Sequence, residues 1–586
     1  MSKKSKTIAK NMKTETKKSK PSSPFSRVKV LGEGLDELGN RYIKVAVVGS
    51  DRDIPPFSVK QLVTEPKPLF AELGNAGWNV FTSKSRHGFL EKLQNRKPHA
   101  AKFKVVTQLG WNSGAYVFPD EIVGEPNEPL ERSFGHLDPA MLSKYRVKPS
   151  LKEWQDNVAA LCVGNSRLMF SVSLAFTGPI LRFVQGPKSG GFQIYGPPET
   201  SKTTAAIVAG SVWGCHRSEG RREKGFLESW NTTGAKAELT ALAHNDAFLV
   251  LDETKTAGGD DSHRAKVVTE VIFKLAEHVE KERLTNQQSA RAWREYFLST
   301  SNLSLAQLAV RGKIGIDEAD RGRLADIPLP KEGYGIYEEL HGFADGAALC
   351  DALQRRSRRY FGTAARKFVR RVVRASRTDR KALKAFLAGE RKTYSAALKS
   401  AAKAENLRPL NRVMGRSATA FAAGSLAIKY SILPWDREKL LQAVLSCELD
   451  HLRHTKEDDL NADPVVSLRS KLVKYLNDHH AKFMNLKTKQ PKLGRDKLDA
   501  VPGYRAKFKR RRWYYLTADQ LKAIIGVGLN AVSLKRQLAG EGLLAKASND
   551  RFVVDRPIFT GGRGKENWAR VHAIKAAICR EGKANG

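Results

Sequence analysis

Residues 192–204 read FQIYGPPETSKTT. The apolar run 192–195 predicts a short strand, and a helix is expected to begin near Thr203. The segment 196–203 between them has the form G-x-x-x-x-S-K-T, one substitution from the phosphate-binding loop G-x-x-x-x-G-K-[ST]. That loop wraps phosphates in backbone N–H groups at the positive end of a helix. The stretch therefore predicts a nucleotide site between a strand and a helix.

The loop assigns a role to each polar residue in it. Lys202 is expected to reach the β- and γ-phosphates of ATP, and the hydroxyl of Thr203 to hold Mg²⁺. Ser201 departs from the pattern, because glycine usually stands there and lets the backbone approach the phosphate without a Cβ. The residues expected to contact nucleotide are Gly196, Pro197, Pro198, Glu199, Thr200, Ser201, Lys202, Thr203 and Thr204.

A second stretch, AFLVLDET at 247–254, complements the loop. Its apolar run predicts a buried parallel strand that ends in two acids. Asp252 is placed to hold Mg²⁺ and Glu253 to polarise the attacking water. A lone run of this kind also fits a strand that simply meets solvent. The two stretches occur in order, 252 − 202 = 50 residues apart, and together they predict a nucleotide-hydrolysing core.

Composition indicates the kind of partner. The chain has 586 residues, and 101 basic against 61 acidic side chains give a formal charge of +40, which favours a polyanion. Nucleic acid is expected rather than a membrane, because no amphipathic anchor is evident. There is also no apolar run of spanning length and no signal-peptide pattern. The five cysteines are scattered and form no CxxC pair, so neither a disulfide framework nor a zinc site is expected. These features predict a soluble, cytoplasmic protein.

Composition shifts along the chain predict several domains. The second helix of the last domain, with Lys535 and Arg536, is expected to be its recognition element. The basic stretch 355–377 fits either a solvated face or a nucleic-acid face. The expected divisions are a disordered basic tail (1–25), an N-terminal α+β domain (26–135), the ATPase domain (136–330), a helical lid (331–452), a linker (453–506) and a winged-helix domain (507–586).

Three further roles known from AAA+ ATPases have candidate residues in this chain. In those enzymes a polar residue ends a strand beside the nucleotide, and Asn302 is favoured for this role, with Thr300 next. Arg321 and Arg323 precede another apolar strand, where an arginine finger could act on a neighbouring subunit; a solvated charge is the alternative. Arg412 opens a lid helix at a place where such ATPases commonly supply another phosphate-sensing arginine.

Over residues 26–575 the chain resembles the family catalogued as domain of unknown function nine-two-seven. Its members look like self-loading AAA+ replicative helicases of mobile elements, phages and plasmids, related to the minichromosome-maintenance helicases. The resemblance favours Arg323 over Arg321 as the finger and matches Arg412 to the lid arginine. A glycine-rich segment of the family appears here without its glycines but with Lys281 and Arg283. The matching segments are LGWNSGAYVFPDEIVG (109–124), SVSLAFTGPILR (171–182), GFQIYGPPETSKTTAAIVAGSVWG (191–214), LTALAHNDAFLVLDE (239–253), YFLSTSN (296–302), RLADIP (323–328) and RVMGRSATAFAAGSLA (412–427).

The expected fold class is α/β: an AAA+ core with an N-terminal α+β domain, a helical lid and a C-terminal winged helix. The expected function is an ATP-driven, ring-forming DNA helicase, a homohexamer with Mg·ATP between subunits. Single-stranded DNA would lie in the pore and duplex at the winged helix, and a separate primase or polymerase is implied. The alternatives are an ATP-switched replication initiator or regulator that does not unwind DNA, and an ATPase that remodels protein, which the charge disfavours.

Overall fold

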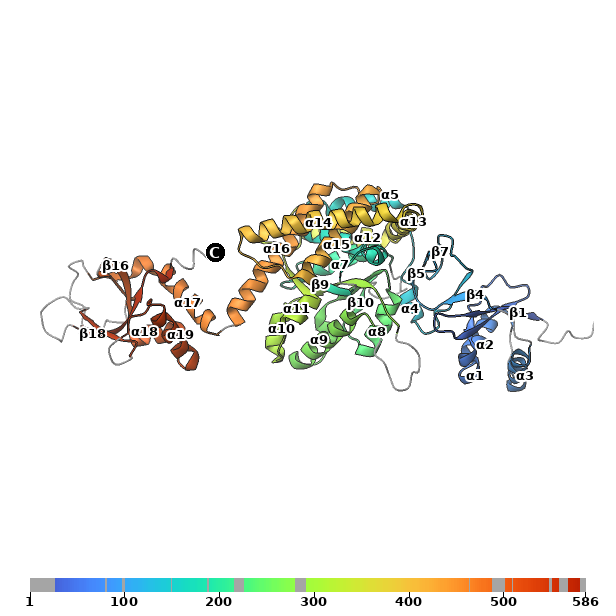
Figure 1. Cartoon of the computed structure of the whole chain (residues 1–586), viewed down its shortest axis with the longest axis horizontal. Coiled ribbons are helices and arrows are strands. Elements are labelled where there is room, and N and C mark those ends of the chain that lie inside the picture. Colours follow the sequence, from blue (N-terminus) through green and yellow to red (C-terminus); the bar gives the residue numbers. More distant parts are fainter. Residues whose placement is uncertain are drawn as a thin grey trace, which may run out of the picture. The chain divides into compact units, whose positions relative to one another are not determined.

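The computed structural model describes residues 27–78, 82–96, 101–148, 150–186, 189–215, 226–279, 291–462, 464–486, 501–508, 510–546, 551–557 and 568–579. The chain divides into two compact units, residues 1–395 with 411–447 and residues 396–410 with 448–586. Figure 1 shows the labelled elements of both units. None of the described helices is long and apolar enough to cross a membrane.

The first unit begins with a mixed five-stranded sheet of order β3-β2-β1-β4-β8. Leu69 and Leu73, one helical turn apart on α2, are buried in its core. The elements are β1 (Val28–Leu35), β2 (Arg41–Val47), β3 (Phe57–Ser58), α1 (Val59–Thr64), α2 (Lys67–Asn75), α3 (Ser83–Gln94), β4 (Ala101–Val106) and β8 (Leu130–Arg132).

A small antiparallel sheet follows, made of β5 (Gly110–Asn112), β6 (Ala115–Val117) and β7 (Ile122–Val123). Ser113 and Gly114 turn between β5 and β6 with φ of 42° and 82°, the left-handed conformation that two-residue hairpins favour. The indole N–H of Trp111 donates to the carbonyl of Pro179 (2.9 Å), and the hydroxyl of Tyr116 donates to that of Asp246 (2.8 Å). Both aromatic rings are buried and tie this sheet to the central domain.

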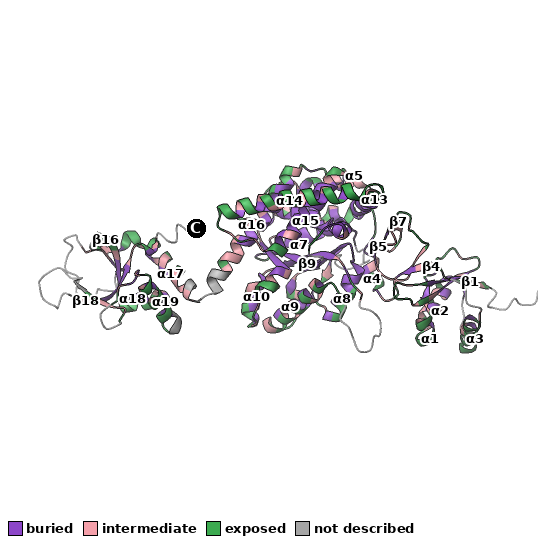
Figure 2. Ribbon diagram, in the orientation of Figure 1, coloured by how far each residue is buried: buried purple, intermediate pink, exposed green. Residues whose placement is uncertain are grey.

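The central sheet has the order β10-β11-β12-β9-β13, and every neighbouring pair is parallel. Because the three central strands β9, β11 and β12 are covered on both faces, they are continuous buried runs, drawn purple in Figure 2. Their parallel direction brings the residues that follow β9, β11 and β12 to one edge. The strands are β9 (Ser189–Tyr195), β10 (Glu228–Ser229), β11 (Phe248–Asp252), β12 (Glu295–Ser301) and β13 (Leu324–Pro328).

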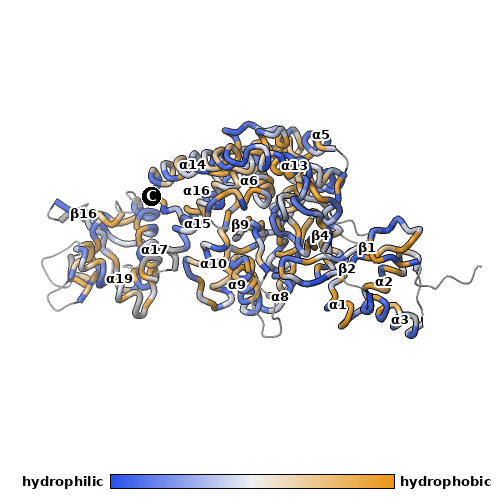
Figure 3. Tube along the Cα trace, turned by 45° about the vertical axis from the view of Figure 1, so that its right-hand side comes forward, coloured by the Kyte–Doolittle hydropathy of each residue, from blue (hydrophilic) through white to orange (hydrophobic). Residues whose placement is uncertain are grey.

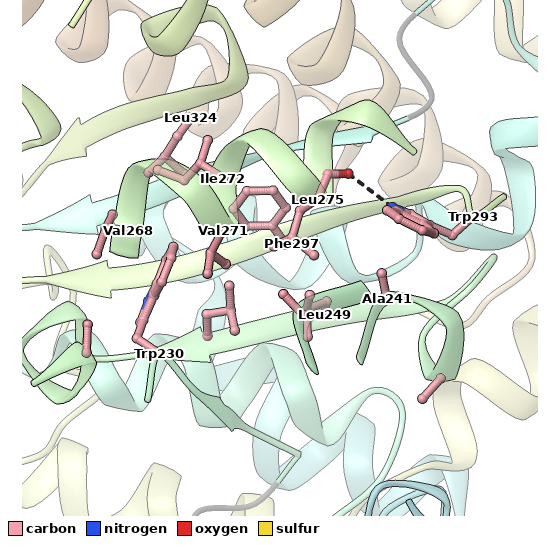
Figure 4. Close-up of a cluster of buried hydrophobic side chains, with 14 of the residues drawn as sticks. Trp230, Ala241, Leu249, Val268, Val271, Ile272, Leu275, Trp293, Phe297 and Leu324 are labelled. Carbon is pink, nitrogen blue, oxygen red and sulfur yellow. Dashed lines mark hydrogen bonds between the residues drawn. The ribbon is translucent and has the colours of Figure 1, made fainter. Parts of the chain in front are cut away.

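Helices cover both faces of this sheet (Figure 1). On one face, Leu249 and Phe297 of the strands pack against Val271 of α9 (Figure 4). The indole N–H of Trp293 donates to the Leu275 carbonyl there (3.0 Å). This face carries α8 (Gly234–Ala243), α9 (Asp261–Glu277) and α10 (Leu305–Gly312); the other carries α6 (Ser166–Ala175) and α7 (Lys202–Ser211).

The stretch 346–462 consists mainly of long helices in which hydrophobic and hydrophilic stretches alternate (Figure 3). On α13 the buried Phe368 and Val372 face inward. Arg366 is buried too and pairs with Asp120 (2.5 Å) and Glu121 (2.8 Å). Part of the basic stretch 355–377 therefore holds the first unit together. These helices are α12 (Gly346–Arg359), α13 (Thr363–Thr378), α14 (Arg380–Ala404), α15 (Asn411–Lys429) and α16 (Arg437–Ala462).

Short helical segments complete the first unit. Together with α6, four of them occupy most of the stretch 151–184. The short segments are α4 (Pro139–Leu142), α5 (Leu151–Trp154), the π-helix η2 (Gln155–Ala159), the 3₁₀ turns η3 (Ala160–Cys162), η4 (Gly178–Phe183) and η5 (Thr254–Ala257), and α11 (Glu318–Arg323).

The second unit is a five-stranded sheet of order β14-β15-β16-β18-β17 with three helices packed on it. The stretch 453–506 differs from the linker expected there, because α16 extends to Ala462 and α17 follows. Leu472 and Leu476 are four residues apart in a stretch that also contains many charged residues. They form the apolar stripe of α17 and are buried. The elements are α17 (Pro464–Asp478), the 3₁₀ turn η6 (His480–Lys482), β14 (Met484–Asn485), β15 (Tyr504–Phe508), β16 (Arg511–Leu516), α18 (Ala518–Ile525), α19 (Leu529–Gly540), β17 (Val554–Pro557) and β18 (Trp568–Lys575).

Candidate nucleotide site

The predicted phosphate loop lies between the end of β9 and the start of α7. Ser201 immediately precedes α7 and adopts the left-handed conformation, with φ of 64°. Glycine tolerates this conformation without a Cβ penalty, which explains the residue type usual at this position. A Cβ on Gly196 would lie 2.6 Å from the Leu329 side chain, so that glycine is needed for packing. The serine thus keeps the backbone shape of the loop.

Lys202 turns back over the loop. Its Nζ donates to the carbonyl of Pro197 (2.5 Å) and to the hydroxyl of Thr200 (3.2 Å). The residue is only 6% exposed, and burial lowers the pKa of its ammonium, while the charge of Glu253 raises it. The ammonium is therefore held among the oxygens of the loop and close enough to interact electrostatically with Glu253, the acid that follows β11.

Asp252 joins three elements of the sheet edge. Its Oδ1 accepts hydrogen bonds from the hydroxyls of Thr203 on α7 (3.0 Å) and Thr300 on β12 (2.9 Å). The Asp252 side chain and the Thr203 hydroxyl are the hard oxygen ligands that Mg²⁺ prefers, with its remaining positions filled by phosphates and water. The residues present thus fit the expected metal, and the structure brings Thr203 and Asp252 together as predicted from sequence.

Glu253 has an unusual backbone held by the same cluster. Its φ of 56° and ψ of 94° lie outside the regular regions. The backbone N–H of Glu253 donates to the Thr300 hydroxyl (2.9 Å), and its carboxylate accepts from the Lys255 N–H (3.2 Å). Strained backbone of this kind is typical of functional sites.

Asn302 follows the last residue of β12 at the same edge and is half-buried. The N–H of Gly196 donates to the Ser301 carbonyl (3.2 Å), which places Asn302 beside the start of the phosphate loop. Among the described residues, however, it is Thr300 whose hydroxyl contacts Asp252 and Glu253. Reasoning from the strand end ranked Asn302 first, because a hydroxyl inside a buried strand gives no separate signal in the sequence.

Arg323 lies at the end of the central strands opposite to the phosphate loop. Arg323 ends α11, and the next residue pairs with Gly191 at the beginning of β9. Gly191 is four residues before Tyr195, or about 13 Å along the strand. The guanidinium of Arg323 pairs with Asp320 (3.1 Å) and lies over the Phe273 ring, 4.7 Å from its centroid. It therefore faces away from the phosphate loop of its own chain.

Arg412 shares that end. It is exposed, and its Cδ lies 3.8 Å from where a Cβ on Gly322 would be. One turn along α15, the buried Arg416 donates to the carbonyls of Gly322 (2.7 Å) and Gly191 (3.3 Å) and fixes this end of the helix. Arg412 was expected among the nucleotide contacts, and the structure does not bring it to the phosphate loop of the same chain.

Thr204 also differs from expectation, because its hydroxyl faces α12. It accepts from the Gln354 amide (2.9 Å) and lies 3.1 Å from the Cys350 sulfur. Its side chain thus anchors α7 to the lid. Lys281 and Arg283 lie outside the described residues.

Comparisons with known proteins find one family model and solved structures of low sequence identity. A family model described as "Domain of unknown function (DUF927)" matches residues 53–295, less than half of the chain. The solved structure "SCCmec type IV Cch - active helicase" is similar in fold, with a TM-score of 0.55, 14% identity and 94% of each chain covered. The NrS-1 C-terminal region reaches a TM-score of only 0.23 at 12% identity, covering 69% of this chain and 88% of that one. No curated protein matches the sequence.

Proposed function

We propose that this chain is an ATP-driven, ring-forming DNA helicase that serves the replication of a mobile genetic element, phage or plasmid. The observation that carries the proposal is the cluster of Thr203, Asp252 and Thr300 beside a phosphate-loop lysine. The fold similarity to a mobile-element helicase supports it. So does the charge of +40, since a protein that moves along DNA must contact phosphates.

In this proposal the residues at the carboxyl edge of the central sheet each have one role in phosphoryl transfer. Mg·ATP supplies the reactive phosphate and a divalent charge that neutralises its oxygens. Lys202 binds the β- and γ-phosphates, and Thr203 with Asp252 holds Mg²⁺. Glu253 accepts the proton of the attacking water, and Asn302 orients that water. Thr300 fixes the positions of Asp252 and Glu253.

Arg323 and Arg412 are assigned to a neighbouring subunit. Both lie near the beginning of β9, and the phosphate loop of the same chain follows the end of that strand, about 13 Å further along. An arginine from a neighbour can stabilise the charge of the transition state. In a homohexamer every site would receive this pair, and a monomer would hydrolyse ATP poorly. Single-stranded DNA would pass through the basic pore, and a separate primase or polymerase would act on it.

An ATP-switched replication initiator or regulator is the second candidate. The left-handed Ser201 favours it, because strain at this position is compatible with a loop that binds nucleotide tightly only in one state. Such a protein would bind ATP and DNA without separating strands.

Strand displacement tests the proposal. The parent chain should separate a forked duplex with ATP, Lys202→Ala should lose nucleotide binding, and Glu253→Gln should bind ATP without turnover. Lys255→Ala, an exposed lysine near the site, is the matched control and should behave as the parent. ATP-dependent DNA binding without displacement would favour the initiator, and turnover by Glu253→Gln at the parent rate would refute the role of that residue.

A further inference from the structure

The second unit contains a pocket of about 560 Å³ at the end of α17. Its walls come from His480, from the β15–β16 hairpin and from the stretch after β18 that ends at Cys579. No residue of α19, the helix expected to recognise duplex DNA, is among the described lining residues of the pocket, and the pocket has the volume usual for small-ligand sites.

The hairpin places three cations in this pocket without a compensating acid. Arg505, Lys507 and Arg512 line it, and no acidic side chain is among its described lining residues. Lys507 and Arg512 are direct cross-strand partners and both are exposed. Like charges placed opposite one another destabilise a sheet. An anion between them would relieve that repulsion, so their placement indicates a ligand.

A hydrogen-bonded group presents a further donor. The Arg505 guanidinium lies 3.2 Å from His480 Nε2 and 3.1 Å from the His480 carbonyl. Arginine can only donate, so Nε2 is the acceptor and Nδ1 carries the proton in the neutral ring. Nδ1 then donates to the Tyr514 oxygen (2.5 Å), and the Tyr514 O–H is left to donate into the pocket. Arg505 is thereby positioned, and within the described part of the pocket lining no acid neutralises its charge.

We propose that this pocket binds one nucleotide of single-stranded DNA, with its phosphate between Lys507 and Arg512 and its base against the Trp513 ring. Trp513 lines the same pocket and is half-buried. Aromatic rings beside cations are the means by which proteins hold single strands without reading sequence. A duplex keeps its bases stacked inside, so it could offer this pocket only phosphates. This proposal depends on the proposed function in one respect: the anion is taken to be DNA because the chain is proposed to act on DNA.

The test is binding by the full chain to a labelled oligothymidylate of about 20 nucleotides, without ATP. Lys507→Ala with Arg512→Ala should weaken binding and make the slope of log affinity against log salt less steep by about 0.7, which is the contribution of the one phosphate that both cations contact on a single strand. The control pair is Lys522→Ala with Arg551→Ala, two exposed cations of the same unit, which should keep the slope. Tyr514→Phe should weaken binding and leave the slope unchanged.

Several results would overturn the proposal. One is an unchanged salt slope in the Lys507 and Arg512 double variant. A second is a loss of duplex binding in this double variant equal to its loss of single-strand binding. A third is displacement of the oligothymidylate by poly-glutamate at equal charge. Either result would indicate a surface that binds polyanions in general. The double variant should melt no lower than the parent, because it removes a like-charged pair; a lower melting temperature would contradict the repulsion on which the inference depends. Binding without unwinding would contradict only the helicase function, and an unchanged slope only the pocket.

Discussion

Replacing Thr300 by valine tests the core of the candidate site. The side chain is buried, and valine keeps its shape while removing the hydroxyl. Two hydrogen bonds are lost, one to the Asp252 carboxylate and one from the Glu253 N–H. A bond to a charged group contributes about 1.5–3 kcal/mol and a neutral one about 0.5–1.5 kcal/mol, so Thr300→Val should lower the free energy of unfolding of the first unit by about 2–4 kcal/mol.

The effect on catalysis should be larger than a general loss of stability. Without Thr300 the strained Glu253 backbone loses its anchor, and a displacement of about 1 Å at a reacting group can cost on the order of a hundredfold in rate. Steady-state ATPase assays well below the melting temperature should show that drop in kcat with a smaller change in KM. Ser299→Ala, which removes a buried hydroxyl bonded to Trp230, is the matched control. Equal kcat for Thr300→Val and the parent would refute the anchoring role.

Three other outcomes are expected. Affinity of the parent chain for single strands should fall by roughly 300-fold or more between about 50 and 200 mM salt if six or more phosphates are contacted, at about 0.7 in slope for each phosphate, and a flat response would contradict electrostatic binding. Arg323→Ala should assemble and bind ATP yet lose turnover by on the order of a thousandfold. Mixing it with Lys202→Ala subunits should restore some ATPase activity, and no recovery in verified mixed assemblies would exclude a finger role. Burial raises the pKa of Glu295 well above its usual value, and no described group pairs with its carboxylate. The folded state therefore keeps a proton that the unfolded chain releases above about pH 4.5. Stability should fall as pH rises above that value, and Glu295→Gln should remove the fall in melting curves between about pH 5 and pH 8.

Local patterns in the sequence were enough to predict the centre of the first unit. The runs 192–195 and 247–251 are buried strands because they are continuous and apolar, and the residues that follow them meet because the strands are parallel. Thr203 and Asp252 were identified for that reason. Their contact needed only the loop motif and the strand direction.

Features that depend on packing between distant segments were not predictable in the same way. Thr300 contacts an acid 48 residues earlier, and nothing in the strand pattern distinguishes it from its neighbours. The position of Arg412 follows from where Arg416 binds carbonyls of α11 and β9, which a helix pattern does not reveal. The stripe of Leu472 and Leu476 is diluted by charges, so α17 was taken for part of a linker.

The separation of Arg323 from the phosphate loop has a consequence for symmetry. The loop and the arginine lie at opposite ends of the same parallel strands. A twofold dimer could bring each arginine to the partner's loop only if one self-complementary patch included both ends of the strands. If the two ends belong to separate patches, contacts run head to tail, and each subunit provides its arginine at one end and accepts an arginine at the other. Such an assembly either closes into a ring or grows as a filament, and in an open assembly the subunit at one end has a nucleotide site that no arginine reaches.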